Sequence, residues 1–422
     1  MSSPQQSPGP VTRSLIAIGE RELVVMMALV QALQALAIDA MLPGLGDIAR
    51  DLSASDANDR QLVVGLFLMG AGLGSLIPGT LADRYGRRTV LLTCLAGNVL
   101  LTAACALVTD FTTMVVLRIL QGVVCAGLSV VPSAIIRDRF DGDRMAKLQS
   151  MIGVIFLTVP MLAPSIGQAI LLVANWRWIF WFMALFGAGI ALWVYLRLPE
   201  TLDPQHRQRI HPRDIAANFG STLTNRESIG YVLASACILG VLWGYIQSSQ
   251  QLVAEHFGAG SSFPVLFGVM AIAMAVANFG NSRIVERFGA RRVSHSALLM
   301  YLGIAQIQLW LASSGHETLT QFVVVMTLTM MAMGFTGANF GSIALQPFAR
   351  IAGAASSVQS FVRLVVGSII GWWVGQAYDQ TALPFAKALV IGGIAALLLV
   401  LFSERGRLFR RIYPAGTPRP LS

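Results

Sequence analysis

Two charged side chains interrupt apolar stretches in the first half of the chain. Asp39 lies near the end of the apolar run 23–43, and Arg118 lies seven residues into the run 111–136. A charge at the bilayer centre costs roughly 2.5–3.5 kcal/mol even on a lenient insertion scale, so a charge there usually faces a cavity and has a function. A buried carboxylate can bind and release a proton. The alternatives are that Asp39 lies among headgroups at its span's end, and that Arg118 is a structural cation bound to backbone carbonyls.

A third charge, Arg363, lies in the middle of the run 352–377, and no carboxylate inside a span of the second half can pair with it. Its side chain could reach the membrane surface, bond carbonyls or line a cavity. If it lines the cavity, Asp39, Arg118 and Arg363 together carry a charge of +1. That charge favours neutral or anionic substrates over lipophilic cations.

A short charged motif occurs twice, 203 residues apart: "DRYGRRT" at 83–89 and "ERFGARR" at 286–292. Basic residues that stop translocation explain the arginines, but not an acidic residue and a glycine at matching positions. Glycine at such a point suits a tight turn with positive φ. The chain is therefore expected to contain two related halves, and "LQSM" (148–151) and "VQSF" (358–361) form a weaker second echo. The matching pairs are Asp83 and Glu286, Arg84 and Arg287, Gly86 and Gly289, and Arg88 and Arg291.

The elements that must position these residues are membrane-spanning helices. The chain is 55% hydrophobic and 12% charged, about half the charge of a soluble domain. Runs of about 20 apolar residues are long enough to cross the bilayer, and only helices satisfy their backbone groups there. We predict an all-α polytopic membrane protein of twelve transmembrane helices, arranged as two six-helix pseudo-repeats. The predicted spans are 23–43, 61–82, 89–108, 111–136, 148–172, 177–198, 229–250, 263–284, 293–313, 320–345, 352–377 and 383–402.

The distribution of basic residues predicts the orientation. With a cytoplasmic N-terminus, 24 of the 30 Lys and Arg residues lie on the inner side and four lie in outer loops. Positive loops stay inside, so both termini are expected in the cytoplasm. The predicted domains are a tail (1–20), a six-helix bundle (21–198), a cytoplasmic linker (199–228), a second bundle (229–403) and a basic tail (404–422) that touches anionic lipid.

Residues that would make an enzyme or a metal site do not gather. The five histidines lie in loops or at span ends, and no nucleotide-binding motif is present. We therefore expect no enzyme activity, no metal, no cofactor and no direct use of ATP. The cysteines all fall in apolar runs without a metal-binding spacing: Cys94, Cys105, Cys125 and Cys237.

The repeated motif resembles the loop that follows the second helix in the major facilitator superfamily. There the pattern is G-x3-D-R/K-x-G-x-R/K-R/K, and the resemblance implies that this loop latches the two halves in the outward-open state. Thr89 replaces the last basic residue of the first copy, and Ser282 replaces the first glycine of the second. The matching residues are Gly79, Asp83, Arg84, Gly86 and Arg88 in the first copy, and Glu286, Arg287, Gly289 and Arg291 in the second.

Three further stretches resemble the drug–proton antiporters of the Bcr/CflA type: "IDAMLPGL" (38–45), "LRILQG" (117–122) and "LAPSIGQ" (162–168). The last is similar to the fifth-helix antiporter motif, of which Pro164 and Gly167 are kept and several glycines are replaced. In the resembled fold the first and fourth helices are neighbours, and Asp39 and Arg118 lie at matching depths. The resemblance therefore implies an Asp39–Arg118 pair, in which protonation of Asp39 from outside frees Arg118.

Other polar and aromatic residues within the spans are candidates for a substrate cavity, because pockets for drug-sized ligands combine apolar walls with a few polar groups. Hydrogen bonds between helices are the alternative for each of them. Gly70, Gly74, Gly122 and Gly127 are expected to allow close helix packing. The cavity candidates are Gln121, Trp243, Tyr245, Gln247, Asn278, Asn339 and Arg363.

These features predict a secondary transporter of the inner (cytoplasmic) membrane that exports small, largely apolar compounds in exchange for protons. Its expected partners are a neutral or anionic small molecule, protons and membrane lipid, with no nucleic acid, and the expected state is a monomer. An importer or a metabolite exporter on the same fold is the main alternative. A membrane-embedded sensor or enzyme is a further one, although the sequence offers no output domain and no clustered catalytic residues.

Overall fold

The computed structural model describes residues 18–140, 142–202, 205 and 219–410 of this chain. Within these ranges all regular secondary structure is helical. Eleven helices of the described chain are long and apolar enough to cross a membrane. A bent pair, Asp59–Gly74 and Ile77–Tyr85, meets at 46° and supplies a twelfth span. The prediction of an all-α protein with twelve spans is therefore confirmed.

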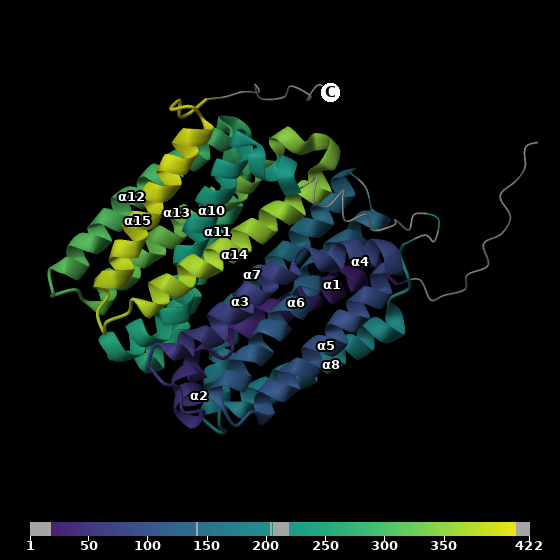
Figure 1. Ribbon diagram of the computed structural model, residues 1–422, viewed down its shortest axis with the longest axis horizontal. Coiled ribbons are helices and arrows are strands. Elements are labelled where there is room, and N and C mark those ends of the chain that lie inside the picture. The colour runs from purple at the N-terminus through teal and green to yellow at the C-terminus, as the bar shows by residue number, and fades with distance from the viewer. Residues whose placement is uncertain (1–17, 141, 203–204, 206–218, 411–422) are drawn as a thin grey trace, which may run out of the picture.

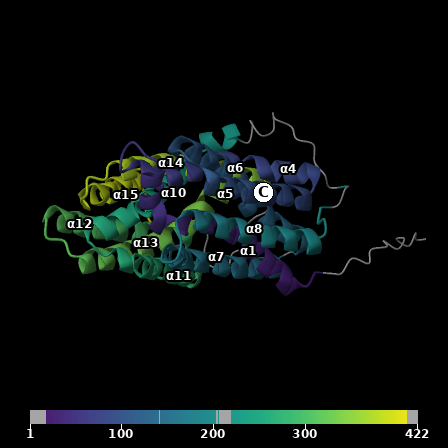
Figure 2. The ribbon, with the colours of Figure 1, turned by 90° about the horizontal axis from the view of Figure 1, so that it is seen from below.

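The helices group into two bundles that lie side by side, the first purple to blue and the second teal to yellow (Figures 1 and 2). The first bundle contains α1 (Glu20–Asp39), α2 (Leu45–Asp51), α3 (Leu62–Gly74), α4 (Ile77–Tyr85), α5 (Arg87–Leu107), α6 (Phe111–Arg139), α7 (Gly142–Leu171) and α8 (Arg177–Arg197). The second contains α10 (Arg226–Gln250), α11 (Phe263–Phe288), α12 (Ala290–Ser313), α13 (Leu319–Leu345), α14 (Ala352–Gln376) and α15 (Leu383–Ser403). The bundles meet where α3 packs on α14 and α7 packs on α11.

Most predicted spans agree with the helices to within a few residues, but the first two differ. The first span runs from Glu20 to Asp51, because a short 3-10 turn and α2 continue it beyond α1. The second is broken between α3 and α4. Pro78 has no N–H to donate to the carbonyl of Gly74, so the helical hydrogen bonds are interrupted there. Nearby, Ser75 Oγ donates to Gly72 O at 2.7 Å. The break lets α4 leave the direction of α3 and carry the first charged loop.

Close packing of α3 against α6 explains the glycines in both helices. A Cβ at Gly70 would lie 2.2 Å from Ile119 O, and one at Gly122 would lie 2.0 Å from Phe67 O. Such distances are too short for any side chain, so glycine alone permits this approach. The expectation that these glycines serve helix packing agrees with the geometry.

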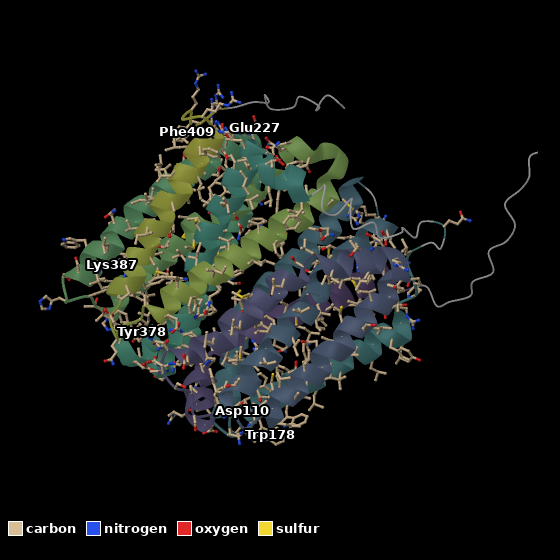
Figure 3. The ribbon with its side chains drawn as sticks, in the orientation of Figure 1. Asp110, Trp178, Glu227, Tyr378, Lys387 and Phe409 are labelled. Atoms are coloured by element: carbon tan, nitrogen blue, oxygen red, sulfur yellow. The ribbon has the colours of Figure 1, made fainter. Side chains whose placement is uncertain are left out.

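The two ends of the molecule are called outer and inner here, following the orientation that the sequence predicts. Asp110 and Trp178 mark the outer end, and Glu227 and Phe409 mark the inner end (Figure 3). At the outer end α6 begins at Asp110, whose carboxylate accepts the N–H of Thr113 at 2.7 Å. That bond lowers the pKa of the Asp110 carboxyl. The predicted linker 199–228 and both predicted tails lie partly outside the described residues.

Candidate functional site

Asp39 is the last residue of α1 and is only 4% exposed. A 3-10 turn and α2 continue the helical segment to Asp51, so Asp39 lies twelve residues before the end of that segment. The depth of Asp39 in the membrane remains a prediction. Among the described residues its carboxylate makes no hydrogen bond and no ion pair. Burying a charged carboxylate without a partner costs free energy.

The expected pair between Asp39 and Arg118 is absent from the described contacts. Arg118 is fully buried, and its guanidinium donates to Val63 O at 2.8 Å, to Ala37 O at 2.8 Å and to Gln121 Oε1 at 2.6 Å. Ala37 lies in the last turn of α1, where carbonyls lack helical donors. Three acceptors already satisfy the guanidinium, so the alternative of a cation bound to carbonyls describes this conformation.

Gln121 belongs to a buried network inside the first bundle. Its Nε2 donates to Thr102 Oγ1 at 2.7 Å and to Asn98 Oδ1 at 3.3 Å. Asn98 also accepts from Cys125 Sγ at 3.1 Å. This network orients the Gln121 oxygen toward Arg118. In this conformation the Gln121 side chain is 0% exposed and is held by protein groups, so its contact with substrate remains a prediction.

The antiporter-like stretch of α7 packs directly beside Asp39. A Cβ at Gly167 would lie 1.8 Å from Ala40 O, so glycine is required where α7 crosses the end of α1. Pro164 lies one turn earlier within the same helix and leaves the carbonyl of Pro160 without its helical donor. The two motif residues thus shape the helix that packs on the end of α1.

The aromatic and amide candidates on α10 lie within packed interfaces. Tyr245 is 2% exposed and its hydroxyl donates to Met270 Sδ at 3.0 Å inside the second bundle. Trp243 packs against Gly367 of α14. Gln247 is 1% exposed, and neither its amide oxygen nor its amide nitrogen has a partner among the described residues. It lies at the seam of the two bundles, where a Cβ at Gly65 of α3 would come within 2.7 Å of its Oε1.

The remaining candidates differ in how well they are satisfied. Asn339 is buried and bonds Asn281 at 2.8 Å, as the interhelical alternative expects. Asn278 is half-buried on α11. Arg363 is half-buried on α14, and its Nη1 lies 3.9 Å from a Cβ built on Gly341 of α13. The described contacts give this guanidinium neither a hydrogen bond nor an ion pair.

Sequence reasoning missed a set of polar contacts that joins the two bundles at the outer end. Arg60 Nη1 lies 2.6 Å from Glu255 Oε1, and its Nη2 donates to Glu255 Oε2 at 2.9 Å. Gln61 Nε2 donates to Gln251 Oε1 at 2.6 Å, and Asn58 Nδ2 donates to Tyr378 O at 2.9 Å. Such loop residues carry no motif, so only the fold reveals their pairing.

At the inner end, the ion pairs of the described residues stay within one half or the other. Arg144 pairs with Glu20 and Arg197 pairs with Glu22 in the first half, whereas Arg226 bonds Phe402 O in the second. The polar contacts between the bundles named above therefore lie at the outer end of the seam.

The first charged loop turns at Gly86, whose φ of +101° is the expected positive value. Arg87 is buried and binds both Asp83 Oδ1 at 2.6 Å and Asp138 Oδ2 at 2.8 Å. Glu200 accepts the backbone N–H of Arg87 at 2.8 Å and caps the start of α5. The sequence analysis did not single out Asp138 or Glu200, because each lies outside the motif on another helix end.

The second loop has the same turn and a different ion pair. Gly289 has a φ of +88°. Arg291 is 8% exposed and binds Glu404 Oε1 at 2.6 Å and Gln346 Oε1 at 2.8 Å. Tyr231 also donates to Glu404 Oε1, at 2.8 Å. Glu404 was assigned to a basic tail, whereas the structure buries it at the end of the second bundle.

Among the other motif residues, Arg88 donates to Tyr195 O of α8 at 2.7 Å, whereas Arg84, Glu286 and Arg287 are exposed. Arg84 and Arg287 each lie over the neighbouring aromatic ring, at 5.2 Å and 5.4 Å. Glu286 is exposed, and Gly79 lies in α4 with Val130 as its nearest neighbour, at 3.5 Å from a built Cβ. The described contacts of both loops stay within their own halves, so the latch assignment remains a prediction about another conformation.

The second echo of the repeat makes the same contact in both halves. Gln149 Nε2 of α7 donates to Ser133 O of α6 at 3.3 Å. Gln359 Nε2 of α14 donates to Ala344 O of α13 at 2.9 Å. A glutamine amide therefore ties the fifth helix of each half to the carbonyls of the fourth.

No side-chain cluster in the described chain is suited to hold a metal, since no three His, Cys, Asp or Glu residues gather there. The four cysteines are free and buried or half-buried. The functional groups of the described chain are thus isolated charges and amides within a helical bundle.

Comparisons with known proteins fit this architecture. The model of the Major Facilitator Superfamily matches residues 27–372. The uncharacterized MFS-type transporter YdgK of Bacillus subtilis (strain 168) is 32% identical over 385 residues, covering 88% of this chain and 94% of that protein. The multidrug resistance protein MdtL of Klebsiella pneumoniae subsp. pneumoniae is 30% identical over 369 residues, covering 86% and 91%. A bicyclomycin resistance protein homolog of Haemophilus influenzae is 27% identical over 371 residues, covering 86% and 90%.

Solved structures with the same fold belong to transporters named for different solutes. The human organic anion transporter MFSD10 matches with a TM-score of 0.71 and 18% identity, covering 92% of this chain and 100% of that one. A D-xylose–proton symporter matches with a TM-score of 0.70 and 16% identity, covering 92% and 98%. At these identities the likeness concerns the fold alone. Together with the repeated loops, the family match shows that this chain belongs to the Major Facilitator Superfamily, as a transporter similar to multidrug resistance proteins.

Proposed function

We propose that this protein exports small, largely apolar, drug-like compounds across the inner membrane in exchange for protons. The observation that carries the proposal is Asp39, a carboxylate buried within the first span, 4% exposed and without a described partner. The relatives named for multidrug and bicyclomycin resistance support the choice of drug-like substrates and of export.

Protonation of Asp39 is proposed to couple to the closing of the outer end. A charged carboxylate cannot be buried alone at low cost, so the conformation with a closed outer end favours the neutral acid. When the outer end opens, Asp39 becomes accessible to outside protons. Loss of the proton toward the inside would leave a charge that favours rearrangement of the neighbouring helices. Arg118, which is held at the end of α1 through Ala37 O, is the cation proposed to respond to that charge.

Arg363 is proposed to set the charge of the substrate. It is a half-buried cation without a described partner, on a helix that packs against the other half. With Asp39 neutral and Arg118 bonded to carbonyls, Arg363 supplies an uncompensated positive charge. Neutral and anionic compounds therefore suit this site better than lipophilic cations.

The test is transport in inverted membrane vesicles with and without a pH gradient. We expect wild-type protein to accumulate substrate when the vesicle interior is acidic. Asp39→Asn should lose this pH-driven uptake while substrate counterflow persists, because the amide mimics the neutral acid but carries no proton. Asp47→Asn is the matched control, since Asp47 is 44% exposed and pairs with Arg50 within the same half.

Two outcomes would contradict the proposal. Proton-coupled uptake that survives in Asp39→Asn would remove Asp39 as the proton carrier. Wild-type transport that ignores the pH gradient, or that accumulates substrate in the opposite direction, would favour an importer or a carrier that is not coupled to protons.

A further inference from the structure

A groove lies between α5 and α8 on the perimeter of the first bundle. These two helices lie side by side at the edge farthest from the second bundle (Figure 1). The groove has a volume of about 590 Å³ and is lined by Leu92, Thr93, Ala96, Ala191, Leu192 and Tyr195. Leu192 and Tyr195 are 58% and 59% exposed, although both lie within a membrane span. The groove therefore opens toward lipid.

A cation lies at the inner mouth of this groove. Arg88 is one helical turn from Leu92, and its guanidinium lies 5.5 Å from the centre of the Tyr195 ring. Its Nη2 donates to Tyr195 O at 2.7 Å. That carbonyl is available because its helical donor would be Pro199, which has no N–H.

The guanidinium of Arg88 forms none of the ion pairs found among the described residues, and its buried Nε has no acceptor there. Glu200 contacts the backbone of this segment: its Oε1 accepts the N–H groups of Arg87, Thr201 and Leu202 at 2.8–3.1 Å, and its Oε2 accepts the N–H of Arg88 at 3.3 Å. Glu200 therefore caps the backbone and forms no ion pair with the side chain of Arg88.

The matching arginine of the second half has protein partners. Arg291, which matches Arg88 in the repeat, is buried, and its guanidinium donates to Glu404 Oε1 and Gln346 Oε1. The available cation beside an apolar groove is thus a feature of the first half alone among the matched pair. A general need to keep arginine at this end would not produce that difference.

We propose that this groove is a binding site for an anionic phospholipid, with an acyl chain along α5 and α8 and the phosphate at Arg88. The apolar lining suits a hydrocarbon chain, and a guanidinium that the described residues leave without an ion pair at the membrane surface suits a negatively charged headgroup. Basic pockets at the cytoplasmic side of helical bundles bind such headgroups. This site is separate from Asp39 and does not depend on the proposed transport reaction.

The test is native mass spectrometry of the full chain in detergent, titrated with phosphatidylglycerol or with phosphatidylcholine of the same acyl chains. We expect wild-type protein to bind one phosphatidylglycerol about fivefold more tightly, since one basic residue near the surface contributes roughly 1 kcal/mol. Arg88→Gln should remove this preference. Ala96→Trp, which fills the groove, should weaken binding of both lipids.

Matched controls separate the site from general lipid adhesion. Arg283→Gln removes an exposed arginine that lies 4.7 Å from the Phe279 ring at the same end, and it should keep the preference. Ile391→Trp adds the same bulk on another exposed surface, at a residue that is 66% exposed. Thr93→Trp replaces Ala96→Trp if the latter unfolds, as judged by thermal unfolding in detergent. Equal binding of both lipids by wild-type protein, or equal losses in Arg88→Gln and Arg283→Gln, would overturn the proposal.

Discussion

At the scale of the residue, the three charges inside the spans differ in how the protein satisfies them. Arg118 has three acceptors within 2.8 Å, Asp39 is buried without a described partner, and Arg363 is half-buried without one. A buried cation whose hydrogen bonds are all made contributes to the structure, whereas a buried polar group without a partner is stabilised when a ligand binds it. We therefore expect the proton to bind at Asp39 and the substrate to bind at Arg363.

Arg363→Gln should reduce export of anionic compounds by about ten- to a hundredfold relative to neutral ones. The reason is the loss of a charge-assisted hydrogen bond, which contributes roughly 1.5–3 kcal/mol. A transport panel of matched neutral, anionic and cationic compounds measures the effect. Lys387→Gln is the control, because Lys387 is an exposed cation near the end of the second bundle (Figure 3). Equal losses for all compounds, or export of organic cations alone, would contradict the assignment.

The sequence identified the charged residues but not their partners. Asp39 and Arg118 stand out because charge is rare in apolar runs, and their depths follow from counting residues. The partners of Arg118 are main-chain carbonyls of Ala37 and Val63, which no side-chain pattern can reveal. The contacts of Gln121 with Asn98 and Thr102 likewise could not be read from the sequence, because they depend on which face of α6 meets α5.

At the scale of the element, glycine positions determine how closely the helices approach. Gly122 touches α3, Gly127 touches Cys94 of α5, and Gly167 touches the end of α1. Apolar periodicity predicts the existence of these helices but not their spacing, because lipid-facing and protein-facing residues are equally apolar. The break between α3 and α4 was missed for the same reason, since Pro78 lies within a run that is apolar throughout.

Gly122→Ala and Gly189→Ala should shift stability in opposite directions. The first places a Cβ 2.0 Å from Phe67 O, and overpacking of this kind costs typically 1–3 kcal/mol. The second meets nothing within 4 Å on α8 and should gain about 0.5–1 kcal/mol from a better helix former. Thermal unfolding in detergent measures both. A loss of stability in Gly189→Ala equal to that in Gly122→Ala would mean that alanine is tolerated no better at an open position.

At the scale of the whole molecule, the sequence repeat predicted two similar halves, and the structure shows which contacts join them. Matching loops 203 residues apart required two similar halves, and Gln149 and Gln359 make equivalent contacts within them. The contacts between the halves do not repeat. Asn58, Gln61 and Arg60 belong to one loop and meet unrelated residues of the other half, so internal symmetry could not predict them.

The pair of Arg60 and Glu255 should help to hold the outer end closed, and charge reversal tests this. Arg60→Glu would set two carboxylates against each other and favour the open outer end. A cysteine in place of Gln247, which is 1% exposed at the seam, reports the opening through its reaction with an impermeant thiol reagent from outside. Glu255 is 44% exposed, so its ion pair with Arg60 contributes up to about 1 kcal/mol to the closed outer end. We therefore expect Arg60→Glu to raise the labelling rate by about fivefold. The double reversal Arg60→Glu with Glu255→Arg should restore slow labelling. Arg50→Glu should leave the rate unchanged, because Arg50 pairs with Asp47 inside the first half. If Arg60→Glu labels no faster than wild type, the amide contacts of Gln61 and Asn58 hold the outer end without this ion pair, and if the double reversal stays as fast as Arg60→Glu, the pairing of opposite charges is not what closes it.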